Sequence, residues 1–281
     1  MSNLKISVVV PLWHYWLDPK KLHPLWALYY ATFLRERNPE AEVEVIDLRG
    51  RHKEEIELPE RDVYFYWIMK SADAPGVYKL VQDTKRRHPG GIHIAGGNHG
   101  DHLTEECARV FDACIIGSGE ELIGQAIKDW QNNNLQPVYR SNQIFHFASY
   151  SFPQRDFLPD YDIVSDKHFA QYGSIPGTGV YFSRGCVFHC SFCLYNNPNR
   201  FELRRPDQIT DEIRYLKQHY SVKGINLRDE VCIPVNRKEA VAMFEAMEMN
   251  AEFEKIVLGE ISEEALRREA QRQGMITLYQ D

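Results

Sequence analysis

The sequence predicts an α/β protein with an N-terminal doubly wound parallel sheet, which is Rossmann-like, followed by a partial β/α barrel of the TIM-like kind. Apolar runs of strand length alternate with helical periodicity five times before residue 130. After residue 174 the order strand, loop, helix, strand occurs only once, and it stops near residue 248. We divide the chain into a first domain (1–130), a linker (131–173), a partial β/α domain (174–248) and a helical tail (249–281).

The predicted strands of the first domain are 5–11, 42–47, 63–67, 91–95 and 113–116. The continuous apolar run at 5–11 is typical of a strand that is buried on both faces of a parallel sheet. Helical spacing of apolar residues predicts helices over 24–38 and 76–88 and another between the last two strands. Ser118 and Glu121 have the spacing of a capping box, so a further helix is expected over 119–131.

Glycine-rich turns follow the fourth and fifth predicted strands. Their candidate binding residues are Gly96, Gly97 and His99 in the first turn, and Gly117, Ser118, Gly119 and Glu120 in the second. Because ligands of such sheets bind beyond the carboxyl ends of the strands, we expect both turns to line one crevice. Glycine lets a ligand approach the backbone closely. The alternative is that the turns bind nothing, since glycine-rich turns occur in most parallel sheets.

The second half of the chain begins with a segment of little periodicity. Residues 131–173 contain several prolines, as linkers do. A strand over 179–183, a helix over 206–219 and a strand over 223–227 then form one β/α unit. Asn236 has N-cap spacing for a helix that reaches Met247.

Three cysteines follow the strand at 179–183 directly. Cys186, Cys190 and Cys193 stand at C-x-x-x-C-x-x-C spacing in the run GVYFSRGCVFHCSFC. Three thiolates can hold three irons of a four-iron four-sulfur cluster and leave the fourth iron open, whereas a structural zinc site needs four protein ligands. Two alternatives stay open, a zinc site with His189 as fourth ligand and three buried free thiols.

The loop SRGCVFHCSFC, with the aromatic Phe192 before its third cysteine, resembles the cluster loop of the radical S-adenosylmethionine enzymes. The resemblance implies a four-iron four-sulfur cluster on the three cysteines, with S-adenosylmethionine bound to it. It also implies that Phe192 touches the adenine and that Asp229 or Glu230 contacts the methionine end. The alternative for Asp229 is a surface ion pair with Arg228. The sequence assigns no role to Cys232.

The element order of the first domain, with its two glycine-rich turns, resembles the cobalamin-binding domain of one branch of that superfamily. This resemblance implies cobalamin at 96–100 and 117–121. The cobalamin-ligating signature D-x-H-x-x-G is absent, because the nearest match, Asp166-Lys167-His168, has Gln171 where the glycine should stand.

The resemblance implies an enzyme in which the cluster cleaves S-adenosylmethionine. The resulting 5′-deoxyadenosyl radical abstracts hydrogen from an unreactive carbon, which in cobalamin-bearing relatives then receives a methyl group. The alternative is a cluster- or cobalamin-carrying binding module that is not catalytic alone, because an exposed radical would be quenched by solvent. Two barrel strands leave an open edge, which the first sheet, the tail or a second copy of the chain must cover. We therefore expect an incomplete catalyst.

Composition limits the partners. The chain has 33 basic and 40 acidic side chains and a net charge of −7, which gives no general attraction to nucleic acid or to an anionic membrane. No apolar stretch approaches about 18 residues, so no membrane span is expected. Six cysteines, three of them candidate metal ligands, favour a reducing cytoplasm. The expected partners are a small-molecule or peptide substrate and an electron donor such as flavodoxin or ferredoxin.

Overall fold

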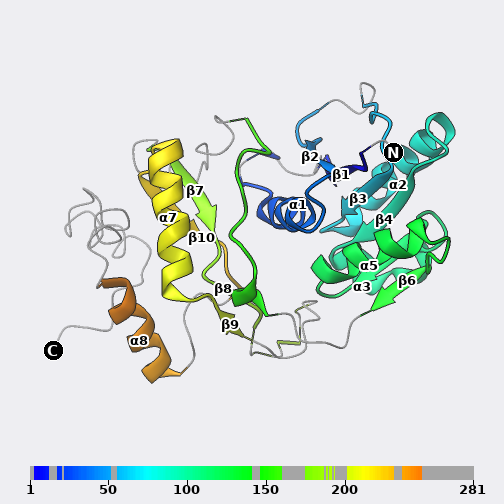
Figure 1. The fold of residues 1–281 in the computed structure, drawn as a ribbon. Coiled ribbons are helices and arrows are strands. Elements are labelled where there is room, and N and C mark those ends of the chain that lie inside the picture. Colours follow the sequence, from blue (N-terminus) through cyan, green and yellow to red (C-terminus); the bar gives the residue numbers. More distant parts are fainter. Residues whose placement is uncertain are drawn as a thin grey trace.

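Six parallel strands form the larger sheet, in the spatial order β2-β1-β3-β4-β5-β6 (Figure 1). The computed structural model describes residues 3–12, 18–20, 22–51, 56–140, 146–159, 175–186, 188, 190–191, 193, 201–230 and 236–248. The strands are β1 (Lys5–Val10), β2 (Glu42–Asp47), β3 (Val63–Trp67), β4 (Ile92–Gly96), β5 (Ala113–Ile116) and β6 (Val138–Arg140). Because β1 lies between β2 and β3, the strand order reverses there and helices cover both faces, as the prediction of a doubly wound sheet requires.

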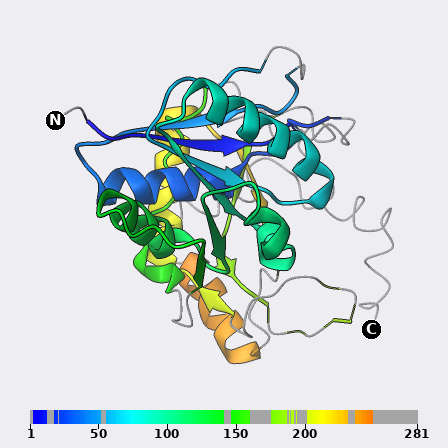
Figure 2. The same ribbon diagram turned by 90° about the vertical axis from the view of Figure 1, so that its right-hand side faces the viewer.

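Two layers of helices enclose this sheet (Figure 2). One face packs against α1 (Leu25–Arg37) and α5 (Glu120–Gln131), and the other against α2 (Ala74–Arg87) and α4 (Thr104–Cys107). The short helix α3 (Asn98–His102) contacts β4 and β5, and the 3-10 turn η2 (Ser71–Asp73) precedes α2.

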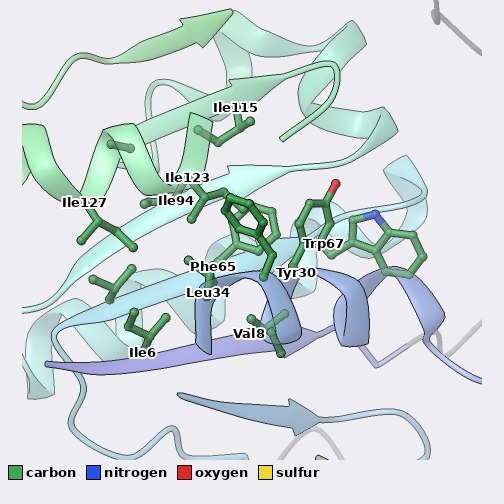
Figure 3. Packing of buried hydrophobic residues seen from close by; sticks show 14 of the residues in the cluster. Ile6, Val8, Tyr30, Leu34, Phe65, Trp67, Ile94, Ile115, Ile123 and Ile127 are labelled. Carbon is green, nitrogen blue, oxygen red and sulfur yellow. The ribbon is translucent and has the colours of Figure 1, made fainter. Parts of the chain in front are cut away.

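Alternate residues of the strands face opposite helix layers. Phe65 of β3 belongs to the apolar cluster under α1 and α5, whereas its neighbours Tyr64 and Tyr66 belong to the cluster under α2. Figure 3 shows Leu34 of α1 and Ile123 of α5 meeting the first of these clusters. Burial on both faces explains why the inner strands β1 and β3 appear in the sequence as apolar runs.

The sixth strand was not expected. β6 lies in the segment predicted to be a linker, and it pairs with β5 in parallel register from Cys114 opposite Val138 to Ile116 opposite Arg140. This strand has three residues at the sheet edge, and only the central Tyr139 is buried. Such a strand produces no apolar run, so the predicted count of five strands was wrong by one.

The predicted capping box at the start of α5 was also wrong. The helix begins at Glu120, with Gly119 as its N-cap, and no side chain caps it. The Glu121 carboxylate instead accepts hydrogen bonds from Arg37 and from the Tyr150 hydroxyl, each at 3.0 Å. Glu121 therefore contacts side chains that are distant in the sequence and does not cap its own helix.

The described residues after 174 contain one parallel β/α unit, as predicted, but its first strand spans Gly177–Val180 and not 179–183. Strands β7 (Gly177–Val180) and β10 (Gly224–Leu227) pair in parallel, and α7 (Pro206–Tyr220) connects them in sequence. Between them β8 (Ser183–Arg184) and β9 (Glu202–Leu203) form a short antiparallel pair. The 3-10 turn η3 (Phe147–Ser149) precedes this unit, and α8 (Arg237–Glu248) follows it. The Asn236 carboxamide caps α8 by accepting the Lys238 amide hydrogen at 2.9 Å.

The edge of β7 that faces away from β10 is covered by residues of the first domain and of the segment before β7. His23 Nδ1 lies 3.0 Å from the Thr178 hydroxyl, and Arg155 donates to the Gly179 carbonyl at 3.1 Å. Helix α1 lies between the two sheets (Figure 1), and its residues Leu28 and Tyr29 pack in one apolar cluster with Tyr181. The first sheet, the tail and a second copy of the chain were the three expected covers for an open edge. At β7 the cover comes from the first-domain side. The tail at 249–281 lies outside the described residues.

Candidate functional site

The cysteine loop follows β8, and Asp229 holds the backbone where the loop begins. Asp229 Oδ1 accepts the Phe182 amide hydrogen at 2.9 Å and the Ser183 hydroxyl hydrogen at 2.7 Å, and it also accepts from the Ser183 amide. Asp229 follows β10, the parallel neighbour of β7. One carboxylate thus fixes the strand that leads into the cysteines to the adjacent strand end.

Asp229 is therefore no surface ion pair, and that alternative was wrong. Burial raises the pKa of this carboxyl group, while its hydrogen bonds to Ser183 and Phe182 oppose the rise. Among the described residues, Oδ2 has no hydrogen-bond partner and is inaccessible to solvent. One oxygen positions the loop, and the other is buried without a hydrogen-bond partner among the described residues.

The three thiols lie on the part of the loop most open to solvent. Cys190 and Cys193 are exposed and Cys186 is half-buried, so the alternative of three buried thiols was wrong. The Phe188 amide donates to Cys186 Sγ at 3.4 Å, and the Cys193 amide donates to the Cys190 carbonyl at 2.9 Å. Within the described ranges, no three histidine, cysteine or acidic side chains are gathered closely enough to hold a metal ion. The thiols share one loop without being pre-assembled.

Glu230 lies beside the same loop. Loss of hydration raises the pKa of its carboxyl group, and the Arg184 charge and the Gly185 amide oppose this rise. Gly185 has a φ of 93°, a left-handed conformation that suits glycine, directly before Cys186. Phe192, His189 and Cys232 lie outside the described residues.

The two glycine-rich turns of the first domain lie together, as predicted. β4 and β5 are parallel neighbours, so their carboxyl ends share one edge of the sheet. The Gly117 amide donates to Asp101 Oδ1 at 2.8 Å, which joins the second turn to α3 of the first. Cofactor binding by these turns stays a prediction.

Packing accounts for two of the glycines. A Cβ at Gly96 would lie 2.6 Å from the Phe65 ring, and one at Gly97 would lie 2.7 Å from the Ile68 carbonyl oxygen. By contrast, Gly117 has a φ of 82°, and a Cβ there would meet no atom within 4 Å. Gly117 therefore marks the open part of this edge, where a ligand could come close to the backbone.

His99, a candidate binding residue, lies inside the fold. Its Nδ1 is 2.9 Å from the Ser71 hydroxyl and its Nε2 is 2.6 Å from the Tyr78 hydroxyl. The side chain is 1% exposed. A ligand would have to displace one of these partners to reach the ring, so the geometry favours a structural role.

Glu120, another candidate, joins the two candidate sites. Its Oε1 accepts from Arg184 Nη1 at 2.8 Å, and the two side chains are 2% and 11% exposed. The Arg184 guanidinium also lies over the Trp26 ring, 4.6 Å from its centroid. Arg184 occurs in the run SRGC, but its partner is 64 residues away, and no local pattern in the sequence could have identified it.

The strand order reverses between β1 and β3, a point of the sheet that the sequence did not locate. In doubly wound sheets the ligand crevice opens at that point. Trp67, the last residue of β3, lies there and packs near Gly97. The sequence predicted where the strands lie along the chain, but not their order in the sheet.

Comparisons with known proteins agree with this architecture. No protein-family model matches the chain. A bacteriochlorophyllide d C-8(2)-methyltransferase of Chlorobaculum tepidum is 24% identical over 156 residues, which cover 54% of this chain and 32% of that protein. Two anaerobic magnesium-protoporphyrin IX monomethyl ester cyclases also match. The Synechocystis enzyme is 28% identical over 56% of this chain and 34% of its own length, and the Rubrivivax gelatinosus enzyme is 22% identical over 74% and 41%.

A solved structure extends the likeness to the whole architecture. The cobalamin-dependent S-adenosylmethionine radical enzyme OxsB, with aqua-cobalamin bound, aligns with 89% of this chain and 38% of its own chain. The TM-score is 0.58 and the identity 14%. The chain resembles the radical S-adenosylmethionine enzymes of the cobalamin-binding branch. It spans about a third to two-fifths of the length of these relatives.

The donor set of the cysteine loop fits the cluster of a radical S-adenosylmethionine enzyme. Three thiols outside any disulfide, two of them exposed, can supply thiolates to three irons. The Phe188 amide that points at Cys186 Sγ is the kind of donor that stabilises a ligating sulfur. No described helix is both long enough and apolar enough to span a membrane.

Proposed function

We propose that the chain binds a four-iron four-sulfur cluster through Cys186, Cys190 and Cys193 and acts in radical S-adenosylmethionine chemistry. The observation that carries the proposal is the position of the cysteine loop. It leaves the end of a strand pair at which Asp229, from the neighbouring strand, holds the start of the loop. When bound, such a cluster supplies the electron that cleaves S-adenosylmethionine and generates the 5′-deoxyadenosyl radical.

The acidic residues beside the loop suit the methionine end of the substrate. The unpartnered Oδ2 of Asp229 and the carboxylate of Glu230 can accept hydrogen bonds from its ammonium group. A cation at this point would offset the desolvation that raises both pKa values. Phe192 is proposed at the adenine by resemblance alone.

The finer proposal is methyl transfer linked to cobalamin. The open edge around Gly117 is the proposed cobalamin surface, with Gly96, Gly97, Ser118 and Gly119 in the same two turns. The solved OxsB structure has aqua-cobalamin bound, and one of the curated relatives is a methyltransferase. We propose an unreactive carbon of a small molecule or peptide as methyl acceptor, flavodoxin or ferredoxin as electron donor, and the cytoplasm as location.

Anaerobic reconstitution with iron and sulfide tests the cluster. Cys186→Ser, Cys190→Ser and Cys193→Ser should each lose most of the iron and the broad visible absorption, because three ligands are the minimum for a site with one open iron. Ser191→Ala, in the same loop, is the matched control and should bind iron like the parent protein. Full iron content in the triple cysteine variant would falsify the proposal.

A second candidate is a cluster- or cobalamin-carrying module that is not catalytic alone. The observation in its favour is that β10 pairs only with β7 among the described residues, and that Leu227 on β10 is 40% exposed. The two candidates differ in the formation of 5′-deoxyadenosine by the reconstituted chain with a chemical reductant. Rapid formation coupled to product favours the enzyme, whereas slow, uncoupled cleavage or none favours the module.

A further inference from the structure

We infer that Glu120 is a positioning residue: through Arg184 it fixes the start of the cysteine loop against the first domain. The inference depends on the proposed function for one point only, namely that the group bound by the loop is an iron-sulfur cluster. The first observation is the ion pair itself, with 2.8 Å between Arg184 Nη1 and Glu120 Oε1. Arg184 immediately precedes Gly185 and Cys186, so the guanidinium is one residue from the loop turn.

On the first-domain side, the ion pair is held by a buried residue at the start of a helix. Glu120 is the first residue of α5 and is 2% exposed, next to the open turn at Gly117. A carboxylate at a helix N-terminus is stabilised by the helix dipole, which fixes the acceptor for Arg184. The Trp26 ring of α1 lies under the guanidinium and contacts Tyr181, with ring centroids 4.7 Å apart. Arg184 thus contacts both helices: Trp26 of α1 through its ring and Glu120 of α5 through the ion pair.

The β/α unit also holds the start of the loop, through hydrogen bonds to its backbone. Asp229 binds the backbone of Phe182 and Ser183, and Arg184 itself pairs with Glu202 of β9 in the antiparallel ladder. Residues 182–184 are therefore held by the β/α unit through Asp229 and by the first domain through Glu120. With both contacts in place, the ion pair links the start of α5, next to the Gly117 turn, to the start of the cysteine loop.

This arrangement has a chemical use in the proposed function. The Gly117 turn is the proposed cobalamin edge, and the cysteine loop is the proposed cluster site. Groups that react with a common substrate have to be held at a defined separation, since a misplacement of about 1 Å can cost roughly 100-fold in rate. Glu120 would provide that separation without touching the reacting atoms.

Amide hydrogen exchange of the full chain without cofactors tests the inference. Glu120→Gln keeps the shape but removes the negative charge that the Arg184 guanidinium faces, so exchange at residues 182–186 should rise about tenfold. Exchange in β3 and α7 should stay as in the parent protein, which distinguishes local release from general destabilisation. Glu121→Gln is the matched control, because the adjacent Glu121 forms an exposed pair with Arg37 and should leave residues 182–186 unchanged.

A double-mutant comparison identifies Arg184 as the link. Arg184→Met should raise exchange at 182–186, Arg184→Lys should restore much of the protection, and adding Glu120→Gln to Arg184→Met should have little further effect. Additive effects of the two substitutions, or equal effects of Glu120→Gln and Glu121→Gln, would overturn the inference.

Iron release separates this inference from the proposed function. If the parent protein takes up the cluster, Glu120→Gln should bind similar iron, since all three thiols remain, but lose it several-fold faster to a chelator. An unchanged rate of loss would count against the positioning role. If the parent protein takes up no iron, the proposed function fails, while the exchange measurements still decide the role of Glu120.

Discussion

The six-stranded sheet is enclosed by helices on both faces, whereas the β7–β10 pair depends on side chains from distant parts of the chain. In the first sheet, apolar residues of β1, β3, β4 and β5 alternate between two clusters. In the second unit, one face packs on α7, and the free edge of β7 is closed by His23 and Arg155. The comparison shows that the first sheet is stabilised by apolar clusters on both of its faces, whereas the β7–β10 pair combines a smaller apolar cluster of its own with apolar and polar contacts to other parts of the chain.

Buried charge shows the difference most clearly. Glu212 of α7 receives hydrogen bonds from Arg155 at 2.7 Å and from Arg204, and all three side chains are at most 2% exposed. Arg155 comes from the segment before β7 and Arg204 follows β9. One carboxylate therefore compensates two buried guanidinium groups that join separate elements.

The largest expected effect follows from that carboxylate. Glu212→Ala leaves two buried arginines without their partner and should destabilise the second unit by about 3–5 kcal/mol. Limited proteolysis should then cut within α7 while the first sheet persists. Asp211→Ala, which removes an exposed pair with Arg214, is the control and should leave the cleavage pattern unchanged. Simultaneous unfolding of both parts would contradict this difference between the two regions.

Acid should act in opposite directions on the two regions. In the first sheet, burial lowers the pKa of His93 to about 4, against an ordinary value of 6.5. The unfolded chain therefore takes up a proton below pH 6.5 that the folded chain takes up only near pH 4. Across that window the free energy of unfolding should fall by about 3 kcal/mol as pH decreases.

The Asp229 carboxyl group has the opposite effect on the pH dependence of stability, because burial raises its pKa in the folded state. Over the interval between its unfolded and folded pKa values, the folded chain binds more protons, so its contribution to stability grows as pH falls. Urea unfolding from about pH 7 to about pH 4 checks both signs in the parent protein and in His93→Gln, which should lose the first effect. If His93→Gln kept the pH dependence of the parent protein, groups other than His93 would be responsible for the loss of stability in acid.

A smaller effect compares strand packing directly. Ile94 of β4 is fully buried, whereas Ile225 of β10 is half-buried. Ile94→Val should cost about 0.5–1.5 kcal/mol, and Ile225→Val should cost less because fewer neighbours lose contact. Chemical denaturation of the two variants gives the ranking, and a larger cost at Ile225 would reverse the comparison.

The smallest effect is expected at a surface contact between α1 and the segment before β7. Arg35 forms two hydrogen bonds with Asp156, at 2.9 and 3.1 Å, but the side chains are 37% and 56% exposed. Solvent screens such a pair, so Asp156→Asn should cost at most about 1 kcal/mol. A thermal unfolding scan at low and high salt measures it, and a loss well above that value would show that the segment is held mainly by this pair.

The sequence predicted what depends on local pattern. The bounds of β2, β3 and β5 agree with the predicted strands: β3 and β5 are contiguous apolar runs, whereas β2 alternates apolar and acidic residues. Asn236 was likewise identified as the cap of α8. The cysteine spacing identified the thiol loop, and parallel neighbours brought the two glycine-rich turns together.

What the sequence did not show depends on distant partners. Asp229 was assigned to a ligand, but one of its oxygens binds backbone 46 or 47 residues away. Glu120 is paired with Arg184 across 64 residues, and β6 is recognisable only beside β5. No periodicity or motif contains such pairings, because they exist only once the chain has folded.

The cover on the edge of β7 also has a consequence for the order of synthesis. The contact between His23 and Thr178 spans 155 residues. At about 5–20 residues per second, a ribosome releases His23 about 8 to 30 seconds before Thr178, long enough for the first sheet and α1 to fold. β7 therefore emerges opposite a surface that is already formed, and the edge that could pair with another chain is closed as soon as it appears. A circular permutant that begins near residue 175 would reverse this order and expose β7 to intermolecular pairing during translation.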